Sequence, residues 1–428
     1  MIDAYLLTFN CARHLVNPET LAPSLFDALP KAAAVPDVLA ISLQEVAPIA
    51  YSFLGGSYLK PYFDRISTTV HLAVDLYSHG SERLEHVATR SLGLTALMIF
   101  AKPQFMERIQ YVQAAGAGLG VWNMGNKGAV AMRIGVSRSD SEELLNISFA
   151  AAHLAPHERA FLERNQNWED LVRNMVFDSG SDSAYSFSDE APLWSSAEAP
   201  ADKVGLFHLG SHLFFAGDLN YRTYDTPPGP DAHKAYPQPA ASDAPPEHFS
   251  DLLKKDQLNR EKKANHTLHG LEELPIEFPP TYKYSLRKNP EGHTSSSSEA
   301  KPHWQWAIHR YPSWCDRILY LPSLASASRV DPQVYTALPI QPTSDHRPVA
   351  LSVRIGDRVP PVDVQDIRAN PPFPINPGWK VRRVVARRYE VVVGILSYLA
   401  LTKKGNAAIA VVLGLTFATY YLSTWLRG

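Results

Sequence analysis

The chain carries the stretch LFFAGDLNYR at residues 213–222, an apolar run that ends abruptly in polar residues. The apolar part predicts a buried β-strand, Leu213 to Ala216, with Asp218 and Asn220 following its end. Because side chains alternate along an extended chain, these two residues are expected to lie on the same side. A strand that delivers a carboxylate and an amide to one edge of a sheet is typical of a catalytic cleft.

Other stretches repeat this pattern of an apolar run that closes on polar residues. The sequence predicts further strands at Ile2–Asn10, Val38–Leu43, Leu94–Phe100, Ala129–Ile134, Leu145–Ala152, Ile318–Tyr320 and Val349–Val353. Helical periodicity appears over His157–Val176 and Glu247–Lys263. Strands dominate and helices are interspersed, which predicts an α/β protein with the strands forming the core.

Composition limits the partners. Net charge is −2, but eight Lys and Arg and only one acid lie from Lys380 onward, so that segment is basic and the rest is acidic. An acidic body is a poor nucleic-acid binder, whereas a basic segment suits an anionic membrane surface. The two cysteines, Cys11 and Cys315, exclude a disulfide framework and fit a reducing compartment, and Met1–Tyr5 shows no secretory signal.

Polar stretches rich in Ser, Pro and acids predict surface loops at Ser179–Ala201, Asp225–Pro246 and Lys288–Pro302. A proline-rich linker is expected over Arg358–Gly378. Near the end, Ala407–Leu426 is free of charge and flanked by basic residues. Such a helix spans ~30 Å, the thickness of a bilayer core, so it predicts a transmembrane helix rather than a buried core helix. The shorter apolar run Val391–Thr402 is expected to be interfacial or packed on the body.

Candidate catalytic residues follow the predicted strands. Asn10 and Glu45 each follow an apolar run and offer the oxygen ligands that Mg²⁺ prefers, although a capping asparagine and a solvated glutamate would look the same. Asn126 and Lys127 follow a glycine-rich stretch that could approach a phosphate. His153 on its own is more typical of a structural histidine.

Two acidic motifs complete the set. Asp316 precedes the strand Ile318–Tyr320, and the pair Asp345-His346 precedes Val349–Val353. An Asp–His pair commonly orients an imidazole that stabilises or protonates phosphate oxygens. Neither cysteine belongs to a Cys-x5-Arg loop, which excludes a thiolate phosphatase. A single cleft across the strand ends would collect all of these residues.

Taken in order, these motifs resemble the superfamily of DNase I-like nucleases, neutral sphingomyelinases and inositol-polyphosphate 5-phosphatases. The stretches NKGAV at 126–130, PPTYKY at 279–284 and PSWCDRIL at 312–319 are similar to the 5-phosphatases in particular. The resemblance covers Met1 to about Ile355. It implies a four-layered α/β sandwich and Mg²⁺-dependent hydrolysis of the 5-phosphate of phosphoinositides or inositol phosphates. The chain is similar to tail-anchored fungal phosphatidylinositol 4,5-bisphosphate 5-phosphatases.

The resemblance also implies residue roles. Glu45 and Asn10 would hold Mg²⁺, Asp218 with Asn220 would activate or orient water, and Asp316 would hold His346 against the scissile phosphate. His153, Asp345, Asn126 and Lys127 would complete the phosphate and metal site. The 4-phosphate would bind Tyr282, Lys283 and Arg310, with Arg317 supporting that wall. Ile308 departs from the family, which commonly has a lysine there; Lys301, His303 or His309 could compensate.

The expected organisation is a catalytic domain at 1–356, a linker at 357–379, a basic juxtamembrane segment at 380–406 and a transmembrane tail anchor at 407–426. The expected location is the endoplasmic reticulum membrane, with a phosphoinositide substrate, no nucleic-acid partner and the catalytic domain in the cytosol. A related phosphodiesterase (sphingomyelinase or nuclease) and a catalytically dead membrane tether are the alternatives.

Overall fold

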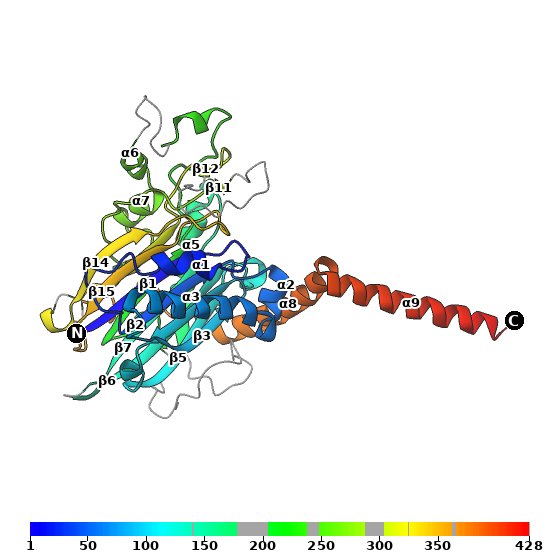
Figure 1. Ribbon diagram of the computed structural model, residues 1–428, viewed down its shortest axis with the longest axis horizontal. Helices are drawn as coiled ribbons and strands as arrows, with labels where there is room; N and C mark the ends of the chain where they lie inside the picture. The colour runs from blue at the N-terminus through cyan, green and yellow to red at the C-terminus, as the bar shows by residue number, and fades with distance from the viewer. Residues whose placement is uncertain are drawn as a thin grey trace.

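The computed structural model describes residues 1–138, 141–177, 204–237, 248–286, 304–323, 325–361 and 365–427. Two mixed sheets form its centre (Figure 1). The six-stranded sheet has the order β14 (Val330–Ala337), β15 (Val349–Ile355), β1 (Ile2–Asn10), β2 (Val38–Gln44), β4 (Thr95–Ala101), β3 (Glu85–Leu92). The five-stranded sheet has the order β13 (Asp316–Tyr320), β10 (Ser211–Asp218), β7 (Ser141–His153), β6 (Gly128–Arg138), β5 (Ile109–Gly118).

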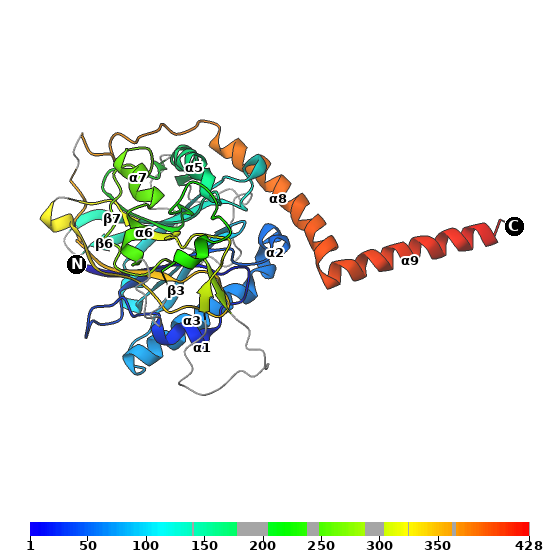
Figure 2. The ribbon, with the colours of Figure 1, turned by 90° about the horizontal axis from the view of Figure 1, so that it is seen from above.

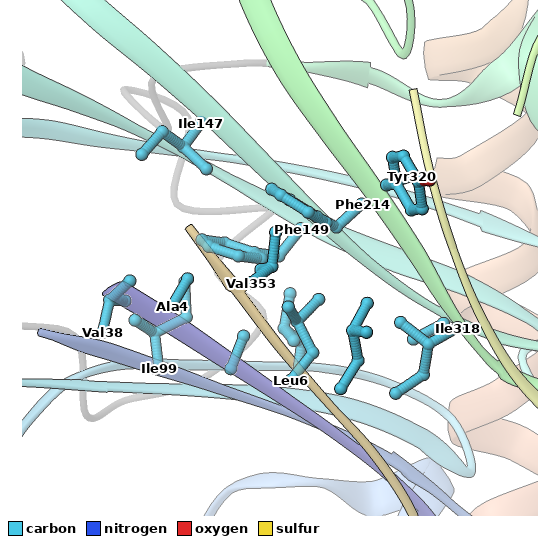
Figure 3. Close-up of a cluster of buried hydrophobic side chains, with 14 of the residues drawn as sticks. Ala4, Leu6, Val38, Ile99, Ile147, Phe149, Phe214, Ile318, Tyr320 and Val353 are labelled. Carbon is cyan, nitrogen blue, oxygen red and sulfur yellow. The ribbon is translucent and has the colours of Figure 1, made fainter. Parts of the chain in front are cut away.

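Successive side chains of a strand point to opposite faces of its sheet, and apolar side chains on both faces build the layers. On β1, Ala4 and Leu6 face the second sheet and pack in one core with Phe149 and Phe214 (Figure 3). The intervening Leu7 belongs to a separate core on the other face of the sheet. Because both faces of each sheet are apolar, each outer face needs a covering of helices.

Those coverings are helical. The helix α3 (Lys60–Ser78), with α1 (Pro18–Leu21), packs on the six-stranded sheet, and α5 (Phe161–Asn174) and α7 (Gln257–Lys263) pack on the five-stranded sheet. Short elements complete the body: α2 (Ile49–Leu54), α4 (Pro103–Met106), α6 (Phe249–Leu253), η3 (Val121–Asn123) and the hairpin β11 (Tyr284–Leu286) with β12 (Trp304–Trp306). The four-layered α/β sandwich is confirmed.

Every predicted strand is present, but three strands of the two central sheets were not predicted: β3, β5 and β14. The glycine-rich stretch is partly strand, since Gly116 and Gly118 belong to β5. The prediction of a single helix over Glu247–Lys263 is wrong. The segment breaks into α6 and α7 because the Asp256 side chain caps α7, accepting a hydrogen bond from the Asn259 N–H at 2.9 Å.

The predicted loops Ser179–Ala201 and Lys288–Pro302 lie outside the described residues, as does the second half of Asp225–Pro246. The described part of the proline-rich linker is held against the body. The Arg368 Nε donates to the Ser211 carbonyl at 2.9 Å, and the Asn376 N–H donates to the Arg173 carbonyl at 2.8 Å.

Two long helices follow the linker, α8 (Trp379–Leu401) and α9 (Lys403–Trp425). The helix α8 lies against the body beside α2, whereas α9 projects away from it (Figures 1 and 2). Gly394 permits the close approach of α8, since a Cβ there would lie 3.1 Å from the Phe53 Cβ. Of the described helices, α9 alone is long and apolar enough to cross a membrane, by length and composition.

Candidate active site

Strand register brings the predicted catalytic residues to one edge of the sandwich. In the parallel pair β1–β2, Asn10 lies opposite Gln44, so Glu45 follows beside it. In the other sheet, Asp218 lies opposite His153 on β7 and opposite Asp316 on β13. The strands of the two sheets therefore deliver their polar ends to a common cavity.

Side chains from separate strands and loops line that cavity. It is lined by Asn10, Arg13, Glu45, Lys127, His153, Pro156, Asp218, Asn220, Arg222, Tyr282, Lys283, Asp345 and His346. Ten of these were predicted as site residues from the sequence. The cavity is strongly polar and contains carboxylates, imidazoles and cationic groups, which suits a charged ligand.

Asp218 is the geometric centre of the site and is almost fully buried. Its Oδ2 accepts a hydrogen bond from the Asn10 Nδ2 at 2.9 Å and lies 3.3 Å from the His153 Nε2. The His346 Nε2 lies 3.9 Å from the same oxygen. Asn220 takes a left-handed backbone conformation, with φ of 57°, and its N–H donates to the Asp218 Oδ1 at 3.1 Å.

These contacts fix the charge state of Asp218. Burial by itself raises the pKa of a carboxyl group, but the His153 hydrogen bond and the nearby His346 charge lower the pKa of Asp218 well below its ordinary value. The carboxylate stays ionised at neutral pH. It can therefore accept a hydrogen bond from a water molecule and orient it.

His346 and Asp316 form a buried ion pair behind Asp218. The His346 Nδ1 lies 2.8 Å from the Asp316 Oδ2, and Thr281 donates to that same oxygen at 2.7 Å. Burial lowers the pKa of His346, but Asp316 and Asp218 outweigh it and raise the pKa to about 9. A protonated imidazole beside the cavity can stabilise or protonate a phosphate oxygen.

Glu45 enters the cavity from a strained position. Its φ of 46° is left-handed, a conformation that costs about 1–3 kcal/mol in a non-glycine residue and clusters at functional sites. Arg13 donates to its carboxylate at 2.9 Å, and the Lys127 Nζ lies 3.9 Å away. Burial raises the pKa of Glu45, but His153, Lys127 and Arg13 together lower it.

The donor set fits a hard divalent cation. The Asn10 Oδ1 accepts a hydrogen bond from the Ala12 N–H at 3.0 Å, and a carbonyl oxygen keeps a second lone pair for a ligand. The Glu45 carboxylate lines the same cavity, and ligand atoms of Asp218, Asp316 and His346 lie within 4.8 Å of one another, although a protonated His346 has no lone pair for a cation. Carboxylate and amide oxygens at one site are the ligands that Mg²⁺ and Ca²⁺ prefer.

A second wall of the cavity is cationic. Lys283 forms an ion pair with Asp345, and the Tyr282 ring packs on the His346 ring with centroids 4.5 Å apart. Arg310 lies nearby rather than among the lining residues; its Nη2 approaches the His157 Nδ1 at 3.3 Å. Ile308 stands where the family commonly has a lysine, and its side chain is uncharged and 61% exposed, so this position adds no charge to the wall.

Arg317, which was expected to support the wall that binds the 4-phosphate, does not line the cavity. Its side chain is fully buried, and its guanidinium is bound by Asp256 at 3.0 Å and Glu273 at 2.6 Å. Asp316 is likewise buried behind His346, where it was expected to hold that histidine. Asn126 does not line the cavity, and its buried Oδ1 has no hydrogen-bond partner in the described part of the chain.

Three cavity residues were not assigned from the sequence: Pro156 and the two arginines Arg13 and Arg222. Arg13 comes from the loop after β1, where a single arginine gives no signal. Arg222 belongs to the quoted stretch at 213–222 and is buried, with its guanidinium 4.3 Å from the centroid of the Tyr282 ring. Its Nη1 has no partner among the described residues, which suits it to an anionic ligand.

The loop that carries Lys127 is held from outside the sandwich. The Glu390 carboxylate on α8 is fully buried and accepts a hydrogen bond from the Gly125 N–H at 2.9 Å. Arg383 pairs with Glu390 at 2.8 Å, and Arg387 donates to the Phe53 carbonyl at 2.6 Å. The helix α8 is therefore part of the support of the site.

Comparison with known proteins agrees with this geometry. The family model described as Endonuclease/Exonuclease/phosphatase family 2 matches residues 7–352. The chain belongs to this family.

Its relatives define the class more narrowly. The chain is 28% identical over 63% of its length to phosphatidylinositol 3,4,5-trisphosphate 5-phosphatase 1 of Xenopus laevis. It is 27% identical over 80% of its length to type II inositol 1,4,5-trisphosphate 5-phosphatase of Mus musculus. The matches span 23% and 29% of those longer proteins. The resemblance to inositol-polyphosphate 5-phosphatases is thus confirmed.

Among solved structures, the chain is similar to the inositol polyphosphate 5-phosphatase domain of SpSynaptojanin in complex with inositol (1,4)-bisphosphate and calcium ion. The TM-score is 0.57 at 20% identity, with 92% of each chain covered. This similarity confirms the fold, and that related domain binds a divalent cation.

The ion pair of His346 gives a prediction that needs no turnover. In metal-free protein, Asp316→Asn should bring the pKa of His346 down from about 9 toward its ordinary value, because the closest negative charge is lost. Nitrogen NMR of the histidine side chains over a pH series would measure this shift. An unchanged pKa of His346 in a folded variant would show that Asp316 does not control its protonation.

Proposed function

We propose that the protein is a Mg²⁺-dependent phosphoinositide 5-phosphatase that converts phosphatidylinositol 4,5-bisphosphate to phosphatidylinositol 4-phosphate. The observation that carries this proposal is the buried Asp218 carboxylate, whose Oδ2 lies 3.9 Å from the His346 Nε2, in a cavity that lysines and arginines also line. This constellation combines a group that orients water with one that neutralises phosphate charge. The 5-phosphatase relatives supply the substrate class.

The reaction is hydrolysis of a phosphate monoester, in which water adds to phosphorus and the inositol oxygen leaves with a proton. Asp218, with Asn220 beside it, orients the attacking water. His346, held by Asp316, and His153 contact the scissile phosphate, and Lys127 adds positive charge. When bound, Mg²⁺ on Glu45 and Asn10 would neutralise phosphate charge, with Asp345 as an additional acid near it. The rate enhancement then comes mainly from positioning and electrostatics.

Substitution of Asp218 tests the role of the water-orienting carboxylate. Asp218→Asn should lower kcat by about 10²–10⁴-fold, the usual contribution of one positioned electrostatic or proton-transfer group. Phosphate release from a soluble inositol trisphosphate would measure it, with thermal unfolding as the check on folding. Near-normal turnover by a folded variant would rule Asp218 out of this role.

Recognition of the 4-phosphate is proposed for Lys283, Tyr282 and Arg310. Lys283 is half-buried and already bound to a carboxylate, so it is held in place rather than free to move. Lys283→Ala should raise KM for a substrate with a 4-phosphate by about 10- to 100-fold, because a charged hydrogen bond contributes roughly 1.5–3 kcal/mol and each 1.4 kcal/mol is about tenfold. An analogue without the 4-phosphate is the matched control, and equal effects on both substrates would contradict the assignment.

The chain is further proposed to be tail-anchored in the endoplasmic reticulum membrane with its catalytic body in the cytosol. The helix α9 has no buried residues across its apolar window, and Lys403 and Lys404 at its start follow the positive-inside bias. A span of moderate hydrophobicity with several Ala, Thr and Ser suits a thin bilayer.

Carbonate extraction and protease protection of isolated membranes test the anchor. The full-length protein should resist carbonate, and its body should be digested outside sealed vesicles. A chain that ends at Thr402 should be released and remain active, because it keeps α8 and Glu390. Release of the full-length chain by carbonate, or a protected body, would contradict tail anchoring.

A further inference from the structure

The helix α8 is buried on one face and carries apolar side chains on the opposite face. Its inner face packs on the body through Ala386, Glu390 and Gly394, which recur at helical spacing and are buried. The outer face should be polar if it faced water, as on a surface helix of a globular protein. Instead it carries large aliphatic side chains.

That outer face is defined here by Val381, Val385, Val392 and Leu396. Their spacings of four, seven and four residues place them on one stripe of the helix. Their exposed fractions are 68%, 41%, 54% and 60%. Exposed apolar stripes of this length mark a binding surface rather than a surface in contact with water.

The course of the chain identifies what covers this stripe. Only Thr402 separates α8 from α9, the membrane-span candidate, and the chain bends sharply there (Figures 1 and 2). A helix attached to the start of a membrane span lies at the height of the lipid head groups. Because α9 turns away from α8, α8 can lie along the membrane surface while α9 enters it.

Charge and aromatic residues fit the same environment. Arg388 lies on the outer face between Val385 and Val392, and Lys403 and Lys404 follow the bend, a basic pattern that suits anionic lipid. Beside α8, Trp122 of η3 is 61% exposed and packs on Tyr389 with ring centroids 4.8 Å apart. Tryptophan and tyrosine are enriched at membrane interfaces.

We propose that the outer face of α8 lies in the head-group region of the same membrane that α9 spans, and so restricts the enzyme to lipid in its own membrane. This inference rests on the proposed anchor and the proposed 5-phosphatase activity. The Glu390 contact with Gly125 connects α8 to the loop bearing Lys127, so docking of α8 sets the height of the cavity above the bilayer. A lipid in an apposed membrane would then be out of reach.

The test uses the full-length protein in vesicles of phosphatidylcholine, phosphatidylserine and phosphatidylinositol 4,5-bisphosphate. The double variant Val385→Asp/Val392→Asp should lose about tenfold or more of the hydrolysis of lipid in its own vesicle, because burial of two valines in the interface is replaced by two charges. Turnover of a soluble inositol trisphosphate should not change. Val385→Leu/Val392→Leu should keep both rates, and Leu76→Asp on α3 is the control for an exposed apolar position elsewhere, with an exposed fraction of 50%.

A second readout does not depend on activity. The two native cysteines are buried, so a fluorophore on Val392→Cys reports on the outer face alone. Nitroxide-labelled lipid should quench it in the full-length protein. An unquenched label, or unchanged lipid hydrolysis by the aspartate variant, would overturn the proposal. Hydrolysis of lipid in apposed vesicles at the same rate as lipid in the protein's own vesicle would also overturn it.

The proposal would also be overturned if the aspartate variant, but not the leucine variant or Leu76→Asp, lost turnover of the soluble inositol trisphosphate. The outer face would then belong to the interior of the protein or to a second copy. Failure of the wild-type protein to hydrolyse the soluble trisphosphate is a different result. It would refute the proposed function, while the quenching would still decide the position of α8.

Discussion

A buried carboxylate has to be paired, because leaving one charge uncompensated costs several kcal/mol. Asp218 meets this constraint with partners from both sheets. Its partners are Asn10 from the six-stranded sheet, His153 from the five-stranded sheet, and His346 from the loop before β15. The core between the sheets sets the distance at which these strand ends meet. The same contacts that stabilise Asp218 keep it ionised and His346 protonated, so packing and chemistry have one origin.

The site also depends on elements beyond the family domain. The residues matched by the family model end at 352, yet the loop that carries Lys127 is tied to Glu390 on α8. The buried Arg383–Glu390 pair costs desolvation, which close geometry and the hydrogen bond from Gly125 offset. In the proposed arrangement, α8 connects the membrane anchor rigidly to the active site, in contrast to a catalytic body on a flexible tether.

Much of this arrangement could be predicted from local sequence. Strands such as β1 and β10 have strong apolar patterns that stop at a polar residue, so their ends identified Asn10 and Asp218. β5 was missed because its alanines and glycines resemble a loop. Arg317 was expected beside the substrate because of its place in a motif, but its partners Asp256 and Glu273 come from distant segments. The pairing of Glu390 with Gly125 joins positions 265 residues apart, which no local pattern reveals.

The central claim is that Asp218, His346 and their neighbours hydrolyse one phosphate of an inositol polyphosphate with a divalent cation. The most direct measurement is release of inorganic phosphate from soluble inositol 1,4,5-trisphosphate by the purified full-length protein, with identification of the inositol product. With Mg²⁺ the account predicts steady release with the 1,4-bisphosphate as product, and loss of release in EDTA that added Mg²⁺ restores. Absence of release by folded protein in Mg²⁺, or removal of a different phosphate, would contradict it.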